Sequence, residues 1–269
     1  MRISRPTLAA LGAAVLTIGS LAWPASASAA GTRYVALGDS YSSGTGAGDY
    51  DPASGSCTRS KNAYPNLWAA QNETESYEFA ACSGATSTDV ASGQLDALSD
   101  ATTLVSITVG GNDAGFSDVM LTCVLRSAST CESRVAEAER YIRDTLPGRL
   151  DDLYGKIRDR APEARVVVLG YPRLYTIVDG CIGIGNAKRK ALNGAADALD
   201  ETIEKAAGRA GFVWSDVRDE FDGHELCSGD DWLNAVAWPF EDSYHPTARG
   251  HRLGYLPAFT GSTARNVLT

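Results

Sequence analysis

Short strand-like runs alternate with longer helical stripes along this chain, and this alternation constrains its fold more than any other feature. The runs cover residues 33–37, 77–80, 104–109, 165–169 and 212–215. Two of them, 104–109 and 166–169, are almost entirely apolar, as strands buried on both faces are. Apolar side chains recur every three or four residues in 132–160, where Pro147-Gly148 is expected to kink or split the helix, and again in 186–210. The alternation predicts an α/β domain in which helices cover both faces of a parallel sheet.

The N-terminal segment has the pattern of a secretory signal peptide. Two arginines precede an apolar stretch over residues 8–21, and the alanines of 25–30 supply small-residue cleavage sites. The stretch is short and rich in Ala and Gly for a membrane anchor, and no later segment is apolar enough for a second span. We therefore expect residues 1–29 to be removed and residues 30–269 to form one secreted, extracellular domain.

Charge and cysteine content narrow the possible partners. The chain has 24 basic and 33 acidic side chains, a net charge of −9, which disfavours nucleic acid and anionic membranes as partners. Six cysteines in an exported chain predict disulfides; fifteen connectivities are possible, and nearest-neighbour pairing is the simplest. Zinc is the competing interpretation, but the chain has no C-x-x-C motif and no cysteine at ligand spacing from a histidine.

Residues suited to ester hydrolysis follow the predicted strands. Ser40 follows the first strand, Gly84 the second and Asn112 the third, and His245 lies near the C-terminus. The carboxyl ends of the strands of such a sheet meet at one edge, where active sites form. A serine hydroxyl becomes a nucleophile when a base such as histidine takes its proton. Backbone and amide N–H groups can then stabilise the oxyanion of the tetrahedral intermediate.

The same segments resemble the SGNH (GDSL) hydrolase family. Gly38-Asp39-Ser40, Gly84, Gly111-Asn112-Asp113 and Asp242-x-x-His245 occur in the family's order over essentially the whole predicted mature chain. Secreted actinobacterial lipases and esterases are most similar, because they share Gly-Asp-Ser-Tyr-Ser-Ser-Gly, Gly-Gly-Asn-Asp-Ala-Gly-Phe and Ser-Tyr-His-Pro-Thr. The resemblance implies a three-layer α/β/α sandwich with a flavodoxin-like, doubly wound sheet of about five parallel strands.

The resemblance also implies individual roles. Ser40 is expected to be the nucleophile and His245 the base, and the oxyanion hole is expected to consist of the Ser40 N–H, the Gly84 N–H and Asn112. The implied disulfides are Cys57–Cys82, Cys123–Cys131 and Cys181–Cys227. Most of the family orients its histidine with an aspartate, here Asp242, whereas some secreted relatives use a backbone carbonyl, here that of Ser243. Trp232, Trp238 and Phe240 precede the histidine and could line an acyl pocket or pack in the core.

These features predict a secreted serine ester hydrolase, a lipase or carboxylesterase that cleaves neutral acyl esters such as acylglycerols. It is expected to act as a monomer, without a cofactor or metal ion and without stable insertion into a membrane. Phospholipase A1, lysophospholipase, thioesterase and carbohydrate acetylesterase activities are alternatives on the same site. An α/β-hydrolase is disfavoured because the serine lacks the second glycine of G-x-S-x-G. A non-catalytic binding module is disfavoured because Ser40, Asn112 and His245 are all present.

Overall fold

The structure is a computed structural model that describes residues 1–2 and 31–264. Its strands are β1 (Thr32–Gly38), β2 (Thr74–Phe79), β3 (Leu104–Thr108), β4 (Arg165–Leu169) and β5 (Val213–Ser215). The α-helices are α1 (Ser40–Ser43), α2 (Tyr64–Gln71), α3 (Ser87–Gly93), α4 (Phe116–Leu125), α5 (Ala128–Asp144), α6 (Leu146–Arg160), α7 (Asn186–Arg209), α8 (Arg218–Phe221), α9 (Ala248–Gly250) and α10 (Leu256–Ala264). Short 3-10 turns cover Pro52–Cys57, Leu95–Ala97 and Phe240–Asp242, and a π-helical turn covers His251–Tyr255.

The five strands form one parallel sheet in the order β2-β1-β3-β4-β5. In its central register Leu37 of β1 lies opposite Ile107 of β3, and both side chains are completely buried. Strand β3 lies next to β1, and β4 lies next to β3. The apolar side chains of these two strands are buried, because strands flank them on both sides and helices cover both faces of the sheet. The sheet edge at the carboxyl ends of β1 and β3 therefore rests on fully buried side chains.

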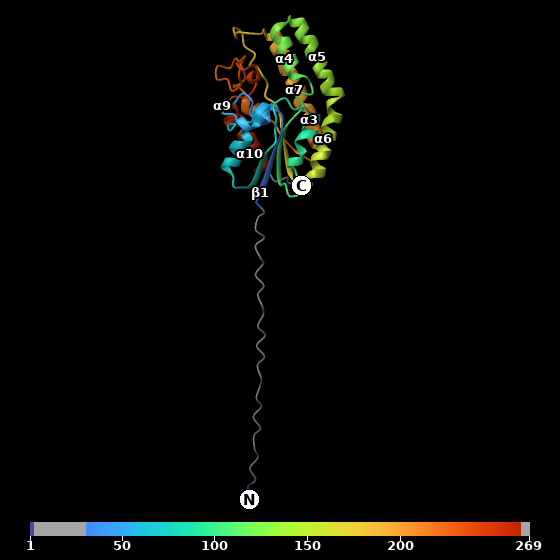
Figure 1. Ribbon diagram of the computed structural model, residues 1–269, viewed down its shortest axis with the longest axis vertical. Helices are drawn as coiled ribbons and strands as arrows, with labels where there is room; N and C mark the ends of the chain where they lie inside the picture. The colour runs from blue at the N-terminus through green and yellow to red at the C-terminus, as the bar shows by residue number, and fades with distance from the viewer. Residues whose placement is uncertain (3–30, 265–269) are drawn as a thin grey trace. The chain divides into compact units, whose positions relative to one another are not determined.

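Helices cover both faces of the sheet (Figure 1). Helices α3 to α7 lie on one side, and α2, α9 and α10 lie on the other. The apolar stripes seen in the sequence face inward: Val135 and Ile142 of α5, Leu150 and Leu153 of α6, and Leu199 and Ile203 of α7 are buried. The predicted α/β/α sandwich with a five-stranded parallel sheet is confirmed.

Local differences from the predicted elements have identifiable causes. Of the two outcomes expected for 132–160, a kink or a split, the structure shows the split: α5 and α6 meet at Thr145, two residues before Pro147. Pro147 lies in the first turn of α6, where its missing N–H would have had no helical partner. Strand β2 begins at Thr74, before the predicted 77–80, because it is an edge strand whose polar residues Glu75 and Ser76 are exposed.

Three disulfides cross-link the domain: Cys57–Cys82, Cys123–Cys131 and Cys181–Cys227. They are the nearest-neighbour pairs that the resemblance implied, and none of the six cysteines is left free to hold zinc. The predicted leader, residues 1–29, lies outside the described residues apart from its first two. Among the described residues, no helix has the length and apolar character needed to cross a bilayer.

Candidate active site

Ser40 lies directly beyond the carboxyl end of β1, in a turn that only a narrow set of residues can form. Gly38 has φ +123°, a backbone conformation that L side chains rarely adopt, and a Cβ there would collide with the Thr108 carbonyl of β3. Asp39 then caps α1, because its carboxylate accepts a hydrogen bond from the Tyr41 N–H at 3.0 Å. Ser40 is the first residue of that short helix. The turn therefore fixes the serine backbone next to the sheet.

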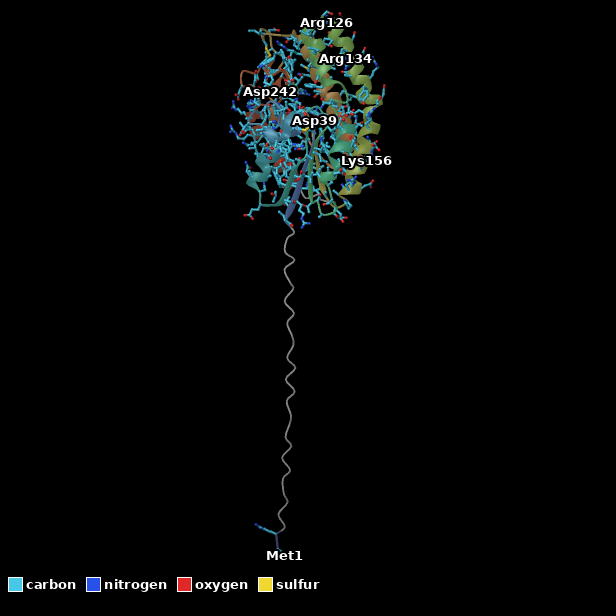
Figure 2. All side chains as sticks on the ribbon, in the orientation of Figure 1. Met1, Asp39, Arg126, Arg134, Lys156 and Asp242 are labelled. Atoms are coloured by element: carbon cyan, nitrogen blue, oxygen red, sulfur yellow. A yellow bond between two sulfur atoms is a disulfide. The ribbon has the colours of Figure 1, made fainter. Side chains whose placement is uncertain are left out.

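A buried hydrogen-bond network lies under the turn. Asp39 is 1% exposed, and its carboxylate accepts from the Thr108 hydroxyl at 2.6 Å and from the Tyr171 hydroxyl at 2.5 Å. Figure 2 shows Asp39 within the domain, away from the surface cations Arg126 and Lys156. Burial raises the pKa of Asp39 to about 6, although the three hydrogen bonds that it accepts oppose this shift. These contacts assign Asp39 a bracing function in the turn.

His245 lies against Ser40. Its Nε2 atom is 2.7 Å from the Ser40 hydroxyl oxygen, which is hydrogen-bond distance for a nucleophile and its base. The His245 ring also contacts the Tyr41 ring, with 5.2 Å between centroids. The Tyr41 hydroxyl donates to the Tyr244 carbonyl at 2.7 Å. Helix α1 and the loop that carries the histidine are therefore joined at two points, although their residues are about two hundred apart in sequence.

The other ring nitrogen of His245 faces a backbone carbonyl. The distance from Nδ1 to the Ser243 carbonyl oxygen is 3.0 Å. A carbonyl only accepts, so this contact requires the proton on Nδ1 and leaves Nε2 free to accept the serine proton. Burial lowers the pKa of His245 to about 4, against smaller opposing effects of the Ser243 carbonyl and the Asp242 charge. The imidazole is consequently neutral, in the form that a general base needs.

Asp242 has a different hydrogen-bond partner. Its carboxylate accepts from the Tyr50 hydroxyl at 2.6 Å, and that hydroxyl accepts from the Gly46 N–H at 2.8 Å. The described contacts thus connect Asp242 to the loop after α1, and the Nδ1 contact of His245 is made by Ser243. Of the two orienting groups predicted from the sequence, the geometry brings the Ser243 carbonyl to the ring.

The predicted oxyanion donors lie on the turns that follow β2 and β3. Asn112 lines the cavity beside Ser40, and its side-chain amide donates to the Ala85 carbonyl at 3.1 Å, which uses one of its two N–H groups. Gly84 has φ +79°, and the space where a Cβ would stand is open. Asp113 ties the two turns together, because its carboxylate accepts from the N–H and the hydroxyl of Ser87.

An apolar cavity opens beside Ser40. Ser40, Asn112 and Asp39 line its polar end, and most of the rest of its wall comes from α4, α5, α7 and the loop after β4. The apolar wall includes Phe116, Val119, Ile142, Leu174, Leu192 and Leu199. Gly84 does not belong to this wall. A cavity with one polar end and hydrocarbon walls suits an acyl chain whose ester group stays at the serine.

Comparison with known proteins decides the family. The GDSL-like lipase/acylhydrolase family matches residues 36–253. Lipase 1 of Streptomyces coelicolor is 53% identical over 253 residues, covering 94% of each chain. The chain belongs to the GDSL-like lipase/acylhydrolase family. It is therefore a carboxylic ester hydrolase of lipase type, as the sequence predicted.

Two solved structures of relatives match this GDSL-family lipase closely. A phospholipase A1 from Streptomyces albidoflavus NA297 is 53% identical with a TM-score of 0.85, and the match covers 87% of this chain and all of that one. An extracellular lipase from Streptomyces rimosus is 52% identical with the same TM-score, covering 86% and 99%. The relatives therefore include proteins described by two different substrate classes.

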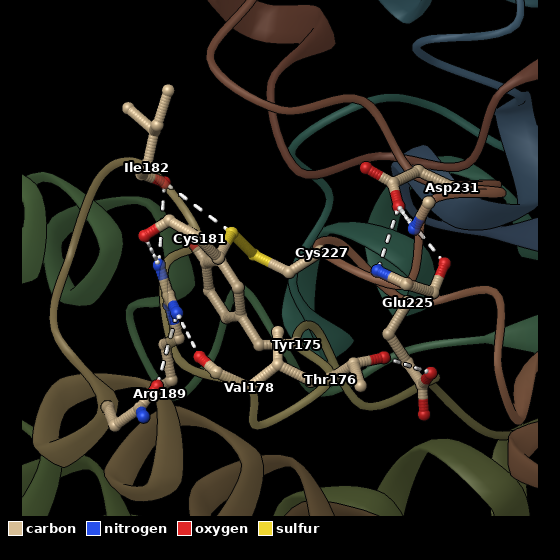
Figure 3. The surroundings of a disulfide bond; sticks show 12 residues. Tyr175, Thr176, Val178, Cys181, Ile182, Arg189, Glu225, Cys227 and Asp231 are labelled. Carbon is tan, nitrogen blue, oxygen red and sulfur yellow. Dashed lines mark hydrogen bonds between the residues drawn. A yellow bond between two sulfur atoms is a disulfide. The ribbon is translucent and has the colours of Figure 1, made fainter.

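The loop after β4 forms one wall of the lipase cavity and is held by a buried cation. Arg189 of α7 is 2% exposed and donates to the carbonyls of Val178, Cys181 and Ile182, as Figure 3 shows beside the Cys181–Cys227 disulfide. Its guanidinium also lies 5.5 Å from the centre of the Tyr175 ring. The hydrogen bonds of the guanidinium and the disulfide therefore fix the loop that presents Leu174 to the cavity.

Tyr171 is the site residue that the sequence analysis missed. Its hydroxyl donates to Asp39 and also lies 3.4 Å from the Gly111 N–H, so it joins the turns that carry Ser40 and Asn112. Tyr171 comes directly after the Leu169-Gly170 end of β4. Its position just beyond the carboxyl end of β4 is therefore the same kind of sequence signal that indicated Ser40, Gly84 and Asn112. Tyr50 gave no comparable signal, because its contact with Asp242 spans 192 residues.

Proposed function

We propose that this lipase hydrolyses neutral acyl esters through an acyl-enzyme at Ser40. His245 Nε2 takes the hydroxyl proton while the Ser40 oxygen attacks the ester carbonyl. Collapse of the tetrahedral intermediate breaks the ester bond, and His245 returns the proton to the leaving alcohol. Water then attacks the acyl-enzyme, with His245 again as base, and releases the carboxylic acid and free Ser40. The 2.7 Å contact between Ser40 and His245 at the polar end of an apolar cavity supports this proposal most strongly.

Three N–H groups are proposed to form the oxyanion hole: those of Ser40, Gly84 and the Asn112 side chain. The open side of Gly84 and the second amide N–H of Asn112 are consistent with this role. Each such donor is worth roughly 3–4 kcal/mol of barrier when it is held in place in advance. Asp113 and Tyr171 would supply that rigidity, because they tie the three turns to one another.

We also propose that the Ser243 carbonyl, rather than the Asp242 carboxylate, orients His245. The carbonyl is 3.0 Å from Nδ1 and holds the required tautomer. In this account Asp242 is a positioning residue that fixes the histidine loop to Tyr50. Because a neutral carbonyl stabilises the imidazolium less than a carboxylate would, catalysis would depend more heavily on the oxyanion donors.

Replacement of the nucleophile tests the mechanism. Ser40→Ala should lower kcat on a soluble nitrophenyl butyrate by about 10⁴-fold or more, with an unchanged melting temperature. His245→Ala should have a similar effect, and the double variant should be no worse than either single variant, because the two groups act as one unit. Wild-type turnover in purified Ser40→Ala would refute the mechanism.

A second pair of variants tests whether the cavity takes the acyl chain. Ala195 of α7 lines the cavity, whereas Ala198, one turn further along and also half-buried, does not. Ala195→Phe should lower kcat/KM for a decanoyl ester about tenfold more than for a butyryl ester. Ala198→Phe should leave that ratio unchanged. Equal losses on both esters in Ala195→Phe would mean that the chain binds elsewhere.

Glycerophospholipid is the second candidate substrate. The 53% identity to a phospholipase A1 that matches over its whole length favours it. Trioleoylglycerol and phosphatidylcholine should be compared at matched interfacial area, with analysis of which acyl position is released. Preferential release of the sn-1 chain from phosphatidylcholine would make the protein a phospholipase A1, whereas faster release from trioleoylglycerol would make it an acylglycerol lipase.

Secretion and a single domain over residues 30–269 remain part of the proposal. The three disulfides are typical of chains that leave the cytosol, and a similar protein is described as an extracellular lipase. N-terminal sequencing of protein from the culture medium should give a start near residue 30. Size measurement of the same material should give the mass of a monomer.

A further inference from the structure

The loop between Asn234 and His245 projects apolar side chains into solvent. The side chains of Val236, Trp238 and Phe240 are 59%, 83% and 65% exposed. The Trp238 and Phe240 rings pack edge to face, 5.3 Å apart, so they form one patch and not isolated exposures. Neither lines the cavity nor belongs to the core, the two places considered from the sequence. We call residues 235–242 the Trp238 loop.

The stem of the Trp238 loop contains the catalytic base. The Asn234 N–H donates to the His245 carbonyl, the Tyr244 N–H donates to the Asn234 carbonyl, and Leu233 pairs with Pro246. Ser243 closes the loop from within, because its hydroxyl accepts from the Ala237 N–H at 2.9 Å. The loop is therefore a braced projection whose position is fixed relative to His245.

The stem that carries the patch adjoins the ester site. The Phe116 ring, which lines the cavity, lies edge-on to the His245 ring at 6.3 Å. The cavity wall therefore meets His245, and His245 belongs to the stem of the Trp238 loop. A surface bound by the loop would be linked to the ester site through this short stem.

The charges around the loop select what can bind there. Glu241 and Asp242 follow the aromatic residues directly, and the chain has no Lys or Arg between Arg218 and Arg249. A membrane-surface site for anionic lipid would carry basic residues. Exposed Trp and Phe on a segment that has acidic residues and no Lys or Arg suit the boundary between headgroups and acyl chains of a neutral or zwitterionic lipid surface.

We propose that the Trp238 loop docks the enzyme on a neutral or zwitterionic lipid surface and holds the Ser40 cavity at that surface. Trp238 and Phe240 enter the interfacial region, while Glu241 and Asp242 disfavour anionic surfaces. The inference extends the proposed function by naming the physical form of the substrate. It is testable without turnover, because docking does not require Ser40.

The test measures binding of Ser40→Ala protein to phosphatidylcholine vesicles by co-sedimentation, so that no lipid is hydrolysed. Trp238→Ser/Phe240→Ser in that background should lower the partition coefficient at least tenfold. Leu125→Ser is the matched control, because Leu125 is 65% exposed, like Phe240, and precedes Arg126, which lies well away from Asp242 in Figure 2. The control should change partitioning less than twofold. Addition of 30 mole per cent phosphatidylglycerol should weaken binding of the parent protein.

Tryptophan fluorescence gives an independent readout. Of the tryptophans that the structure describes, Trp68 and Trp232 are buried and Trp214 is half-buried, so Trp238 alone is largely exposed. Phosphatidylcholine vesicles should shift the emission of the Ser40→Ala protein to shorter wavelength, and Trp238→Phe should abolish the shift while it keeps most of the binding.

Three results would overturn the proposal: equal binding by the double variant, equal loss in Leu125→Ser, or tighter binding to anionic vesicles. Analytical sedimentation in lipid-free buffer tests a second way in which the proposal could fail. If the parent protein formed a dimer and Trp238→Ser/Phe240→Ser stayed monomeric, the patch would be an interface between two copies of the chain and not a lipid-docking site. With an active Ser40, the double variant should keep full activity on soluble nitrophenyl butyrate, which shows that it folds. If the protein did not bind vesicles, hydrolysis of soluble esters at Ser40 could still be correct. If Ser40 were not the nucleophile, vesicle binding by the Trp238 loop could still be correct.

Discussion

The turn that carries Ser40 and the loop that carries His245 are held in place by different kinds of contact. The Ser40 turn is fixed by buried side chains of the sheet and core: Thr108, Tyr171 and Gln94, which pairs with both the N–H and the carbonyl of Gly38. The His245 loop is fixed largely by backbone groups, and its tip is exposed. Ser40 is therefore carried by the core, whereas His245 is carried by a loop whose tip is exposed.

This contrast predicts how the two regions respond to substitution. Changes of side chain in the Ser40 turn should cost stability and activity together, because buried donors lose their acceptors. Changes of side chain in the His245 loop should cost less, because the orienting carbonyl is part of the main chain and survives them.

Gly38→Ala should have the largest effect on stability. The new Cβ would require φ +123° and would overlap the Thr108 carbonyl, so we expect a loss of about 3 kcal/mol or more in the free energy of unfolding, or no soluble protein. Gly84→Ala is the control: its φ is also positive, at +79°, but its Cβ meets nothing, and about 1 kcal/mol should be lost. Urea titrations measure both values. Similar losses in the two variants would show that the Thr108 contact is unimportant.

Tyr171→Phe removes one hydrogen bond of the network under Ser40, and its effect on stability should be smaller than that of Gly38→Ala. The buried Asp39 carboxylate would lose one donor, which should cost about 2 kcal/mol of unfolding free energy and about tenfold in kcat through displacement of the turn. Tyr154→Phe is the matched control, since the Tyr154 hydroxyl is buried and has no hydrogen-bond partner among the described residues. Losses of equal size in both variants would mean that the Asp39 contact contributes nothing specific.

Asp242→Asn should have a small effect, because the Ser243 carbonyl remains on Nδ1. We expect less than a threefold decrease in kcat, and the same from Tyr50→Phe, which removes the partner of Asp242. In a serine hydrolase whose histidine depends on an aspartate, replacement of that aspartate by asparagine costs about 10⁴-fold. A loss of that size would assign Asp242 the orienting role and refute the one proposed for Ser243.

Among these predictions, the smallest change in activity is expected when the pH is lowered from 8 to 6. A base must be neutral, and burial lowers the pKa of His245 from about 6.5 to about 4, so protonation should begin only well below pH 6. From pH 8 to pH 6, kcat/KM on a soluble ester should change less than twofold. Asp39→Asn, which removes the site carboxyl whose pKa is raised to about 6, should retain this flat region. A decrease of about fourfold by pH 6 would indicate an ordinary histidine.

The sequence predicted the parts of the molecule that depend on local pattern. The five parallel strands, the two long helical regions and the positions of Ser40, Asn112 and His245 at one edge followed from apolar periodicity and from the rule for strand ends. The contact of His245 with Ser243 could only be offered as one of two options, because residues two and three before the histidine can both reach the ring.

Other features depended on contacts that sequence spacing does not encode. Tyr50 and Asp242 meet only because the fold brings two loops together. Trp238 and Phe240 have the composition of core residues, and their exposure follows from the closure of their loop by Ser243 and Asn234. Such positions, where a local expectation of burial fails, are the ones most informative about function.

Covalent labelling tests the central claim, that Ser40 activated by His245 is the nucleophile. The protein is treated with a nitrophenyl alkylphosphonate, which leaves a stable adduct on an activated serine, and the modified peptide is identified by mass spectrometry. We predict one adduct, on Ser40, with Ser42 and Ser43 of the same helix unlabelled, and labelling at least 10³-fold slower in His245→Ala. An adduct on another residue, or undiminished labelling of Ser40→Ala or His245→Ala, would contradict the account.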